Sequence, residues 1–380
     1  MYRIHYKTEL VIGTNALEEL RSFQNQGILM VADPFLEKTG QLEYVKNHLD
    51  SSNRVTVFTE VCPDPPIEVI VAGIQSSQEQ TIDIILAIGG GSALDAAKAI
   101  YYFGKKEGGF QEVTLIAIPT TSGTGSEVTD FSVITDADLG RKYPIVDREL
   151  LPDLAILDAN LVRSLPRQIT ADTGIDVLTH VLEAYVSTQA TDFSDALVEK
   201  TVQLVFEYLP KAYRNGQDME AREKMHIAST MAGMAFNTTS LGIVHSLSHA
   251  SGAVFHIPHG RMNSILLPKV IAYNAGLEGA RIGNQQLEVA KRYQQLARIL
   301  GCSAPNPAQG VKQLLDKLRQ LQRKLDLPET LAAYGIDQPS FEREKESIAE
   351  SALKDPCTVT NPRQPSVSDL ATILSTSYRE

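Results

Sequence analysis

The spacing of the hydrophobic residues changes once along this chain, at about residue 167. Before that point, short apolar runs recur at intervals of nearly thirty residues, and segments with helical spacing separate them. Apolar runs of this length are typical of buried strands, so the alternation predicts a mostly parallel sheet with helices on its faces. After residue 167 the apolar residues follow a helical spacing alone. We therefore predict an α/β domain followed by an all-helical domain.

The predicted elements follow this division. Strands are expected at residues 27–33, 54–60, 82–91 and 113–119, with shorter candidates at 131–135 and 153–158 around a turn near 136–140. Helices are expected at 65–80 and 92–104 between strands, and at 171–209, 219–236 and 284–300 beyond the boundary, with a loop at 302–310. A chain of 380 residues exceeds one ordinary core. The predicted domains are residues 1–167 and 168–380.

Charge and composition exclude several classes of protein. Lys and Arg total 35 against 46 Asp and Glu, and the formal charge of −11 repels nucleic acid. The start lacks the apolar core of a signal peptide, and no apolar run approaches the length of a membrane span. The three cysteines are distant and odd in number, which indicates a reducing compartment and no thiolate metal site. We expect a cytoplasmic protein without nucleic-acid or membrane partners.

Glycines and hydroxyls follow two of the predicted strands. The segment "AIGGGSALDAAKAI" turns from a strand into a helix through Gly89, Gly90, Gly91 and Ser92, and Asp95 lies in the first helical turn. Exposed amides at such a helix start attract phosphate, although glycine also serves a purely steric turn. The next strand ends in "PTTSGTGSEVT", with five hydroxyls at residues 120–126. This loop suits a phosphate or a ribose, and the alternative is a solvent-exposed turn.

An acidic residue closes the first long strand. Asp33 follows "ILMVA", where a carboxylate can bond the 2′-hydroxyl of an adenosine ribose and repel a 2′-phosphate. An Asp before proline is also a common turn former. Because ligands bind beyond the carboxyl ends of parallel strands, the three strand ends together predict a dinucleotide site that prefers NAD to NADP.

Four of the eight histidines lie within "GIVHSLSHASGAVFHIPHG", residues 242–260. His245 and His249 are four apart on an apolar helix, and Pro258 should end any helix and leave His259 in a turn with Gly260. Upstream, "DTGIDVLTHVLEAYVS" spaces Asp176 and His180 four apart on a predicted helix. An ordinary polar helix face, continued by Thr179 and Glu183, is the alternative. One carboxylate with several imidazoles suits a divalent ion such as iron or zinc, and spacing alone does not select the ligands.

In combination, these four motifs resemble the iron-containing (group III) alcohol dehydrogenases over nearly the whole chain. The resemblance implies a dehydroquinate synthase-like fold, a nicotinamide cofactor, one divalent metal and a homodimer or larger homo-oligomer. It implies that the metal ligands are Asp176, His180, His245 and His259, that His249 lies beside the substrate, and that His256 is a packing residue or supports the ligands. It also implies a set of cofactor-binding residues: Gly90, Gly91, Ser92, Asp95, Thr120, Thr121, Gly123, Thr124 and, in "GRKYP", Lys142.

The predicted activity is reversible hydride transfer between a short-chain primary alcohol or diol and NAD. The metal, with Fe²⁺ favoured over Zn²⁺, stabilises the alkoxide, and His249 relays the alcohol proton. Three alternatives stay open at this point. They are an NAD- and metal-using lyase or cyclase of the dehydroquinate synthase type, a glycerol dehydrogenase-like polyol oxidoreductase, and a scaffold that keeps a vestigial site.

Overall fold

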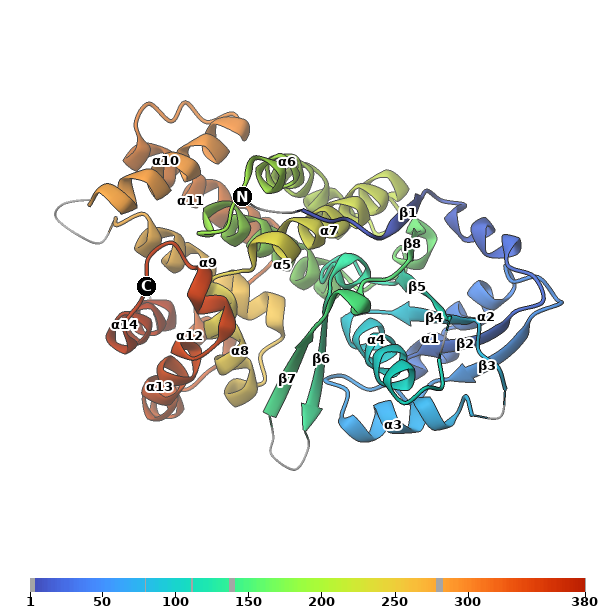
Figure 1. The fold of residues 1–380 in the computed structure, drawn as a ribbon. Helices are drawn as coiled ribbons and strands as arrows, with labels where there is room; N and C mark the ends of the chain where they lie inside the picture. The colour runs from blue at the N-terminus through green and yellow to red at the C-terminus, as the bar shows by residue number, and fades with distance from the viewer. Residues whose placement is uncertain (1–3, 79, 111, 137–140, 278–282, 380) are drawn as a thin grey trace. The chain divides into compact units, whose positions relative to one another are not determined.

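The computed structural model describes residues 4–78, 80–110, 112–136, 141–277 and 283–379 (Figure 1). The chain divides into two compact units. The first contains Met1–Leu165 and Gln217–Asn237, and the second contains Pro166–Gly216 and Thr238–Glu380. The division at residue 165 lies two residues from the predicted boundary. The grouping of 217–237 with the first unit is a feature that the change of hydrophobic spacing does not indicate.

A parallel sheet forms the centre of the first unit, as predicted. Its strand order is β1-β8-β5-β4-β2-β3, and every neighbouring pair is parallel. The strands are β1 (Glu9–Ile12), β2 (Gly27–Ala32), β3 (Arg54–Phe58), β4 (Ile84–Gly89), β5 (Thr114–Pro119) and β8 (Leu154–Leu157). Every residue of β2 and β4 is buried, which explains their continuous apolar sequences. The sequence analysis did not predict β1.

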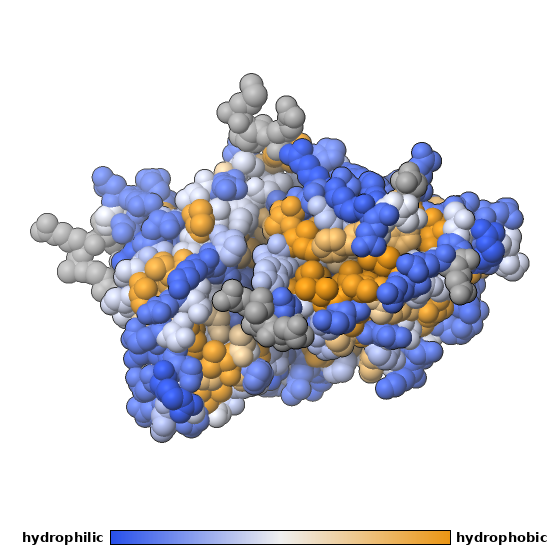
Figure 2. All heavy atoms as spheres, turned by 60° about the horizontal axis from the view of Figure 1, so that its bottom comes forward, coloured by the Kyte–Doolittle hydropathy of each residue, from blue (hydrophilic) through white to orange (hydrophobic). Residues whose placement is uncertain are grey.

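Alternate residues of the strands enter two different cores. In β2, Leu29 and Val31 join the core beneath α3 (Ile67–Gln75) and α4 (Gly91–Lys106), while Ile28 and Met30 join the core on the other face. That second core also includes residues of η1 (Ala16–Ser22), α1 (Pro34–Lys38) and α2 (Gln41–Lys46). Because successive side chains of a strand point to opposite faces of the sheet, they enter the two cores in turn. Hydrophobic side chains also reach the surface over α3 (Figure 2).

The predicted strand at 131–135 exists but does not join the main sheet. It forms β6 (Phe131–Asp136), which pairs antiparallel with β7 (Arg141–Val146) as a separate two-stranded sheet. Most of the turn predicted near 136–140 falls outside the described residues. Short 3-10 turns η2 (Ser126–Val128), η3 (Arg148–Leu150) and η4 (Ala159–Leu161) complete the connections.

The described part of the second unit is helical, as predicted. Its helices are α5 (Arg167–Val186), α6 (Asp192–Arg214), α8 (Ile243–Phe255), α9 (His259–Asn274), α10 (Asn284–Ile299), α11 (Pro307–Lys324), α12 (Leu331–Tyr334), α13 (Gln338–Leu353), η5 (Pro356–Thr360) and α14 (Val367–Tyr378). The helical pattern at 171–209 is broken after Val186, because Thr191 and Ser194 form a capping box that begins α6. Among the residues described, no helix has both the length and the apolar character needed to cross a bilayer.

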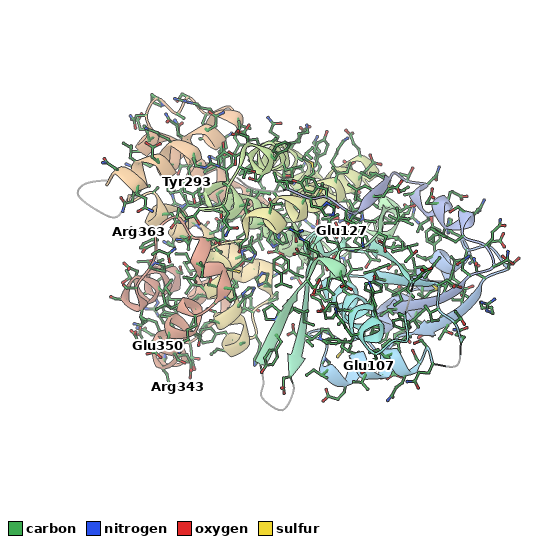
Figure 3. All side chains as sticks on the ribbon, viewed as in Figure 1. Glu107, Glu127, Tyr293, Arg343, Glu350 and Arg363 are labelled. Carbon is green, nitrogen blue, oxygen red and sulfur yellow. The ribbon has the colours of Figure 1, made fainter. Side chains whose placement is uncertain are left out.

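Helix α7 (Met219–Thr239) packs on the loop that follows β5, through contacts within the first unit. Thr230 donates a 2.6 Å hydrogen bond to the buried carboxylate of Glu127, which Figure 3 labels, and Asn237 accepts one from the Asp130 amide. Gly125 and Gly233 meet where the loop crosses the helix. A Cβ on Gly233 would lie 2.7 Å from the Gly125 oxygen and 2.9 Å from its Cα. Only glycine permits this approach of helix and loop.

We expect Gly233→Ala to destabilise the protein by about 1–3 kcal/mol, because the added methyl group overlaps backbone atoms of Gly125. The matched control is Gly252→Ala in the interior of α8, where the new Cβ would lie 3.8 Å from the Ile257 oxygen, an ordinary van der Waals contact. Removing a helical glycine there should stabilise by about 0.5–1 kcal/mol. Urea unfolding measures both changes. Equal effects of the two substitutions would contradict the close crossing.

Candidate metal centre and nucleotide-binding loops

The three polar strand ends identified in the sequence lie at neighbouring strands of the sheet. Asp33 follows β2, the glycines follow β4, and the hydroxyl-rich loop follows β5, in the spatial order β5-β4-β2. Asp33 Oδ2 lies 3.4 Å from the position that a Cβ on Gly89 would occupy. The chain reverses its direction across the sheet between β2 and β4, which is where open α/β sheets bind ligands.

The glycine turn and the hydroxyl loop touch each other directly. A Cβ on Gly91 would lie 2.8 Å from Thr124 Cγ2, and one on Gly90 would lie 3.3 Å from Thr121 Cγ2. Gly89 has a φ of +149°, which disfavours other residues. Gly90 is the N-cap of α4, so the first amides of this helix, from Gly91 onward, have no partner within the helix and point toward the glycine turn at its start. These features suit a phosphate group.

Hydrogen bonds behind the hydroxyl loop hold it in place. Ser122 Oγ lies 3.0 Å from Nδ1 of His226 on α7, and burial lowers the pKa of His226 to about 4, so this imidazole is neutral at pH 7. Both carboxylate oxygens of Asp95 are bonded, to Ser126 Oγ at 2.8 Å and to the Val133 amide at 3.2 Å. Asp95 therefore ties α4 to the loop and to β6. The predicted cofactor residue Lys142 has its backbone in β7, and its side chain is outside the described part of the structure.

The four predicted metal ligands come together in the second unit. Asp176 and His180 lie one turn apart on α5, His245 lies on α8, and His259 is the first residue of α9. The expectation of a turn at His259 was wrong, because Pro258 acts as the N-cap of a helix there. Helix α8 ends as predicted before Pro258, at Phe255. The exposed His256 ends it with a φ of +53° and has no observed role among the ligands.

The separations of the donor atoms match a metal site. Asp176 Oδ1 lies 3.8 Å from His180 Nε2, 3.7 Å from His245 Nε2 and 3.6 Å from His259 Nε2. A tetrahedral ion bound at about 2.1 Å separates its ligand atoms by about 3.4 Å. The donor atoms of Asp176, His180 and His245 all lie within 4.8 Å of one another, and His259 approaches this group at Asp176. One carboxylate and three imidazoles are also a suitable donor set for these ions.

The same group of residues balances its buried charges. Burial opposes ionisation of Asp176, yet the surrounding imidazoles outweigh it and hold the pKa of this carboxyl well below its usual range. Burial likewise disfavours the charged form of His245, but Glu183 and Asp176 raise its pKa to about 9. Binding of a divalent cation would therefore displace a proton from His245 and replace its charge beside two carboxylates.

Glu183 fixes the orientation of His245. This glutamate is 4% exposed, and its carboxylate accepts hydrogen bonds from the amides of Gly242 at 3.0 Å and Val244 at 2.6 Å and contacts His245 Nδ1 at 2.5 Å. A carboxylate at Nδ1 leaves Nε2 directed to the metal ligands. A Cβ on Gly242 would lie 2.8 Å from Glu183 Oε1, so glycine is required at the start of α8.

Two further contacts organise the start of α9. Asn263 is fully buried and donates through Nδ2 to Asp176 Oδ1 at 2.7 Å, with His259 Nε2 3.2 Å away. Arg261 makes a bidentate pair with Asp172 of α5 at 3.0 and 2.9 Å. These bonds tie the first turns of α9, where His259 lies, to α5.

His249 lies beside the ligands but faces a different carboxylate. Its ring stacks on His259 with centroids 5.3 Å apart, and its Nδ1 lies 2.9 Å from Asp355 Oδ2. Cys357 lies with them, since one ligand atom from each of the three residues falls within 4.8 Å of the others. Burial and then the negative charge of Asp355 raise the pKa of the Cys357 thiol well above its usual range. The neutral thiol is a poor ligand, so we assign no metal to this second group.

Sequence reasoning missed several residues that shape the two sites. Glu183 was interpreted as part of a polar helix face, and Asn263, Asp355 and His226 carried no signal of their own. Glu183 was the one within reach of a sequence argument, because it lies three residues after His180 on the same helix. The others depend on contacts between residues distant in the chain.

Comparisons with known proteins agree on one family for both units. The model of the iron-containing alcohol dehydrogenases matches residues 7–159, and the model of the C-terminal part of the Fe-containing alcohol dehydrogenase family matches residues 170–378.

Individual relatives cover nearly the whole chain. A 1-propanol dehydrogenase of Salmonella typhimurium is 44% identical over 359 residues, which are 94% of this chain and 94% of that protein. An NADPH-dependent butanol dehydrogenase of Clostridium saccharobutylicum is 36% identical and covers 100% of this chain and 98% of its own. The crystal structure of a 1,3-propanediol oxidoreductase superposes with a TM-score of 0.89 at 29% identity, covering 100% of both chains.

We expect Glu183→Gln to weaken divalent metal binding by about 10- to 100-fold, because the amide no longer holds the Nδ1–H form of His245 by charge. Competition with a chromophoric chelator measures the dissociation constant of the purified protein. Glu350→Gln, an exposed glutamate on α13 that Figure 3 labels, is the matched control. Equal affinities of the two variants would show that Glu183 has no influence on the metal site.

Proposed function

The chain belongs to the iron-containing alcohol dehydrogenase family, and from this premise we propose that it interconverts a short-chain primary alcohol and its aldehyde with NAD and one divalent metal ion. The observation that carries the proposal is the convergence of three imidazole nitrogens on one buried carboxylate oxygen, at 3.6–3.8 Å. Family membership favours this oxidoreductase over the lyase, the cyclase and the scaffold.

The protein's own residues provide position and charge for the reaction. When bound, the divalent ion stabilises the alkoxide form of the alcohol, and NAD accepts the hydride from the substrate carbon. Asp176, His180, His245 and His259 hold the ion. The first amides of α4 and the loop at 120–124 bind the cofactor phosphates and nicotinamide end, with Asp95 supporting that loop from behind. Iron is the ion we propose, and the same donors accept zinc.

His249 handles the alcohol proton in this scheme. Its side chain is 45% exposed, against 39% for His259 and only 2% and 6% for His245 and His180. An imidazole that contacts both the ligand group and solvent can accept a proton from the alcohol and release it to water. Positioned proton transfer of this kind contributes about 10²- to 10⁴-fold to the rate.

Asp33 supports NAD as the cofactor in place of NADP. Its Oδ1 caps α1 by accepting bonds from the amides of Phe35 and Leu36, at 2.9 and 3.2 Å. Oδ2 faces the Gly89 turn, where it is placed to bond a ribose hydroxyl and to repel a phosphate. The butanol dehydrogenase relative is named for NADPH, so the preference proposed here rests on this carboxylate.

The substrate class follows from the relatives and from the charges near the ligands. The 1-propanol and butanol dehydrogenases support a short unbranched alcohol. A phosphorylated lyase substrate requires basic side chains, and Arg261, which follows His259 by two residues, is already paired with Asp172. The diol and polyol substrates carry one or more further hydroxyl groups, and they form the second group to assay.

Removal of the metal should abolish turnover, because the alkoxide then has no stabilising charge. We expect chelator-treated protein to lose NADH production from 1-propanol and to regain it with Fe²⁺ or Zn²⁺. His245→Ala should lose both the metal and the activity. His256→Asn, in the same segment but exposed, should keep both, since Asn tolerates the positive φ there. Full activity in metal-free protein would refute the scheme.

Asp33→Ser should shift cofactor preference without unfolding the first unit. Serine retains an N-cap oxygen for α1 and removes the charge that repels a 2′-phosphate. We expect the ratio of kcat/KM for NADP to that for NAD to rise at least about tenfold, a difference of about 1.4 kcal/mol. Steady-state kinetics with both cofactors give the ratio, and thermal unfolding checks the cap. An unchanged ratio would assign Asp33 to helix capping alone.

A further inference from the structure

A carboxylate distant in the sequence fixes the ring of His249. Asp355 is the N-cap of η5 and lies 106 residues after His249, yet its Oδ2 is 2.9 Å from His249 Nδ1. The side chain of Asp355 is 16% exposed, so the contact is largely shielded from water. Because a low local dielectric strengthens polar contacts, this contact restrains the His249 ring more than a fully exposed one would.

The other oxygen of Asp355 is also held, so the carboxylate cannot rotate freely. Oδ1 accepts the Cys357 amide at 2.8 Å and lies 3.4 Å from Ser246 Oγ on α8. Thr358 Oγ1 lies 2.8 Å from that same serine hydroxyl and 2.7 Å from the Ala352 oxygen. Helix α8 is therefore joined to Asp355 through His249 and Ser246, and to η5 through the bond between Ser246 and Thr358.

The position of the carboxylate determines where neutral His249 carries its proton. A carboxylate only accepts hydrogen bonds, so Nδ1 must be the N–H, and the lone pair is then on Nε2. The opposite tautomer would direct a lone pair at a carboxylate oxygen. The neighbouring Cys357 thiol is neutral and does not compete as an anion for this contact.

We propose that Asp355 is a positioning residue that holds His249 as the Nδ1–H tautomer, leaving Nε2 as the nitrogen that accepts the alcohol proton. This inference rests on the proposed function of His249. Asp355 touches neither the metal ligands' donor atoms nor the substrate in this scheme, and it acts through His249 alone. The same arrangement orients metal-bound histidines through their second nitrogen.

Two substitutions keep an N-cap oxygen for η5 and change the contact with His249. Asp355→Asn accepts the Cys357 amide but can also donate to Nδ1, and Asp355→Ser caps the turn but does not reach the ring. We expect kcat for alcohol oxidation to fall by about 10- to 100-fold in both variants, with metal content and KM for NAD unchanged. Asp337→Asn, at the N-cap of α13, is the matched control and should keep the wild-type kcat.

A double-mutant cycle distinguishes positioning from general damage. In a His249→Gln background, Asp355→Asn should lower kcat by less than about twofold, because its partner is already gone. An equal loss in both backgrounds would overturn the proposal. If His249→Gln alone keeps the wild-type rate, the proton role of His249 fails, and the proposal fails with it. If His249→Gln is impaired and both Asp355 variants are not, only the positioning role fails.

The tautomer itself can be observed in the holoenzyme. In Zn²⁺-loaded protein labelled with ¹⁵N-histidine, the signals of neutral His249, assigned by their loss in His249→Gln, should show a protonated Nδ1 and an unprotonated Nε2. Asp355→Ser should shift them toward a mixture of the two tautomers. Identical nitrogen shifts in wild type and Asp355→Ser would overturn the inference, even if activity falls.

Discussion

A buried carboxylate imposes the architecture of the second unit. Asp176 is 6% exposed and ionised, and an unpaired charge in that position is strongly unfavourable. Three imidazoles and the Asn263 amide surround it, and they come from three helices. Because the charge is tolerated only where these donors converge, helices α5, α8 and α9 must meet closely. Glycines at 242 and 260 permit the approach, since a Cβ at Gly260 would overlap the Asp172 carbonyl. The candidate metal centre therefore gathers polar groups from three helices around one buried charge.

In the first unit, close contact between backbone segments positions the loops that follow the strands. Its ligand loops follow strands whose positions the sheet fixes, but the loops themselves have little apolar side chain to anchor them. Helix α7 provides the anchor through His226, Thr230 and the Gly125–Gly233 contact, and each interaction ends on the hydroxyl-rich loop or on η2. This explains why a helix in the helical half of the sequence is grouped with the sheet. Its polar contacts are to the hydroxyl-rich loop, to η2 and to the Asp130 amide, and they hold this segment in place.

Local patterns in the sequence predicted those features that local physics determines. Continuous apolar runs predicted the parallel strands, the four-residue spacing of Asp176 and His180 predicted two side chains on one helix face, and Pro258 predicted the end of α8. Features set by contacts between residues distant in the chain leave no such local pattern. Neither the separate pairing of β6 with β7 nor the edge strand β1 has a distinctive composition. The loop at 302–310 was predicted too long, because α11 begins within it at Pro307, a residue favoured at the first helical position. The partners of His245 and His249 lie 62 and 106 residues away, and no spacing rule connects them.

A carboxylate contacts Nδ1 of both His245 and His249 on helix α8. The two histidines differ in burial, and we propose different roles for them. His245 is 1% exposed, and Glu183 is itself fixed by two helix amides, so the free Nε2 has no access to water and can only face the other ligands. His249 is one turn further along the same helix, but it is 45% exposed. There the same orientation leaves Nε2 able to exchange a proton with solvent. A metal ligand must present a lone pair in a fixed position, while a proton carrier must be oriented and in contact with solvent. The difference between the two histidines therefore lies in solvent access, since the hydrogen bond that orients each ring is of the same kind.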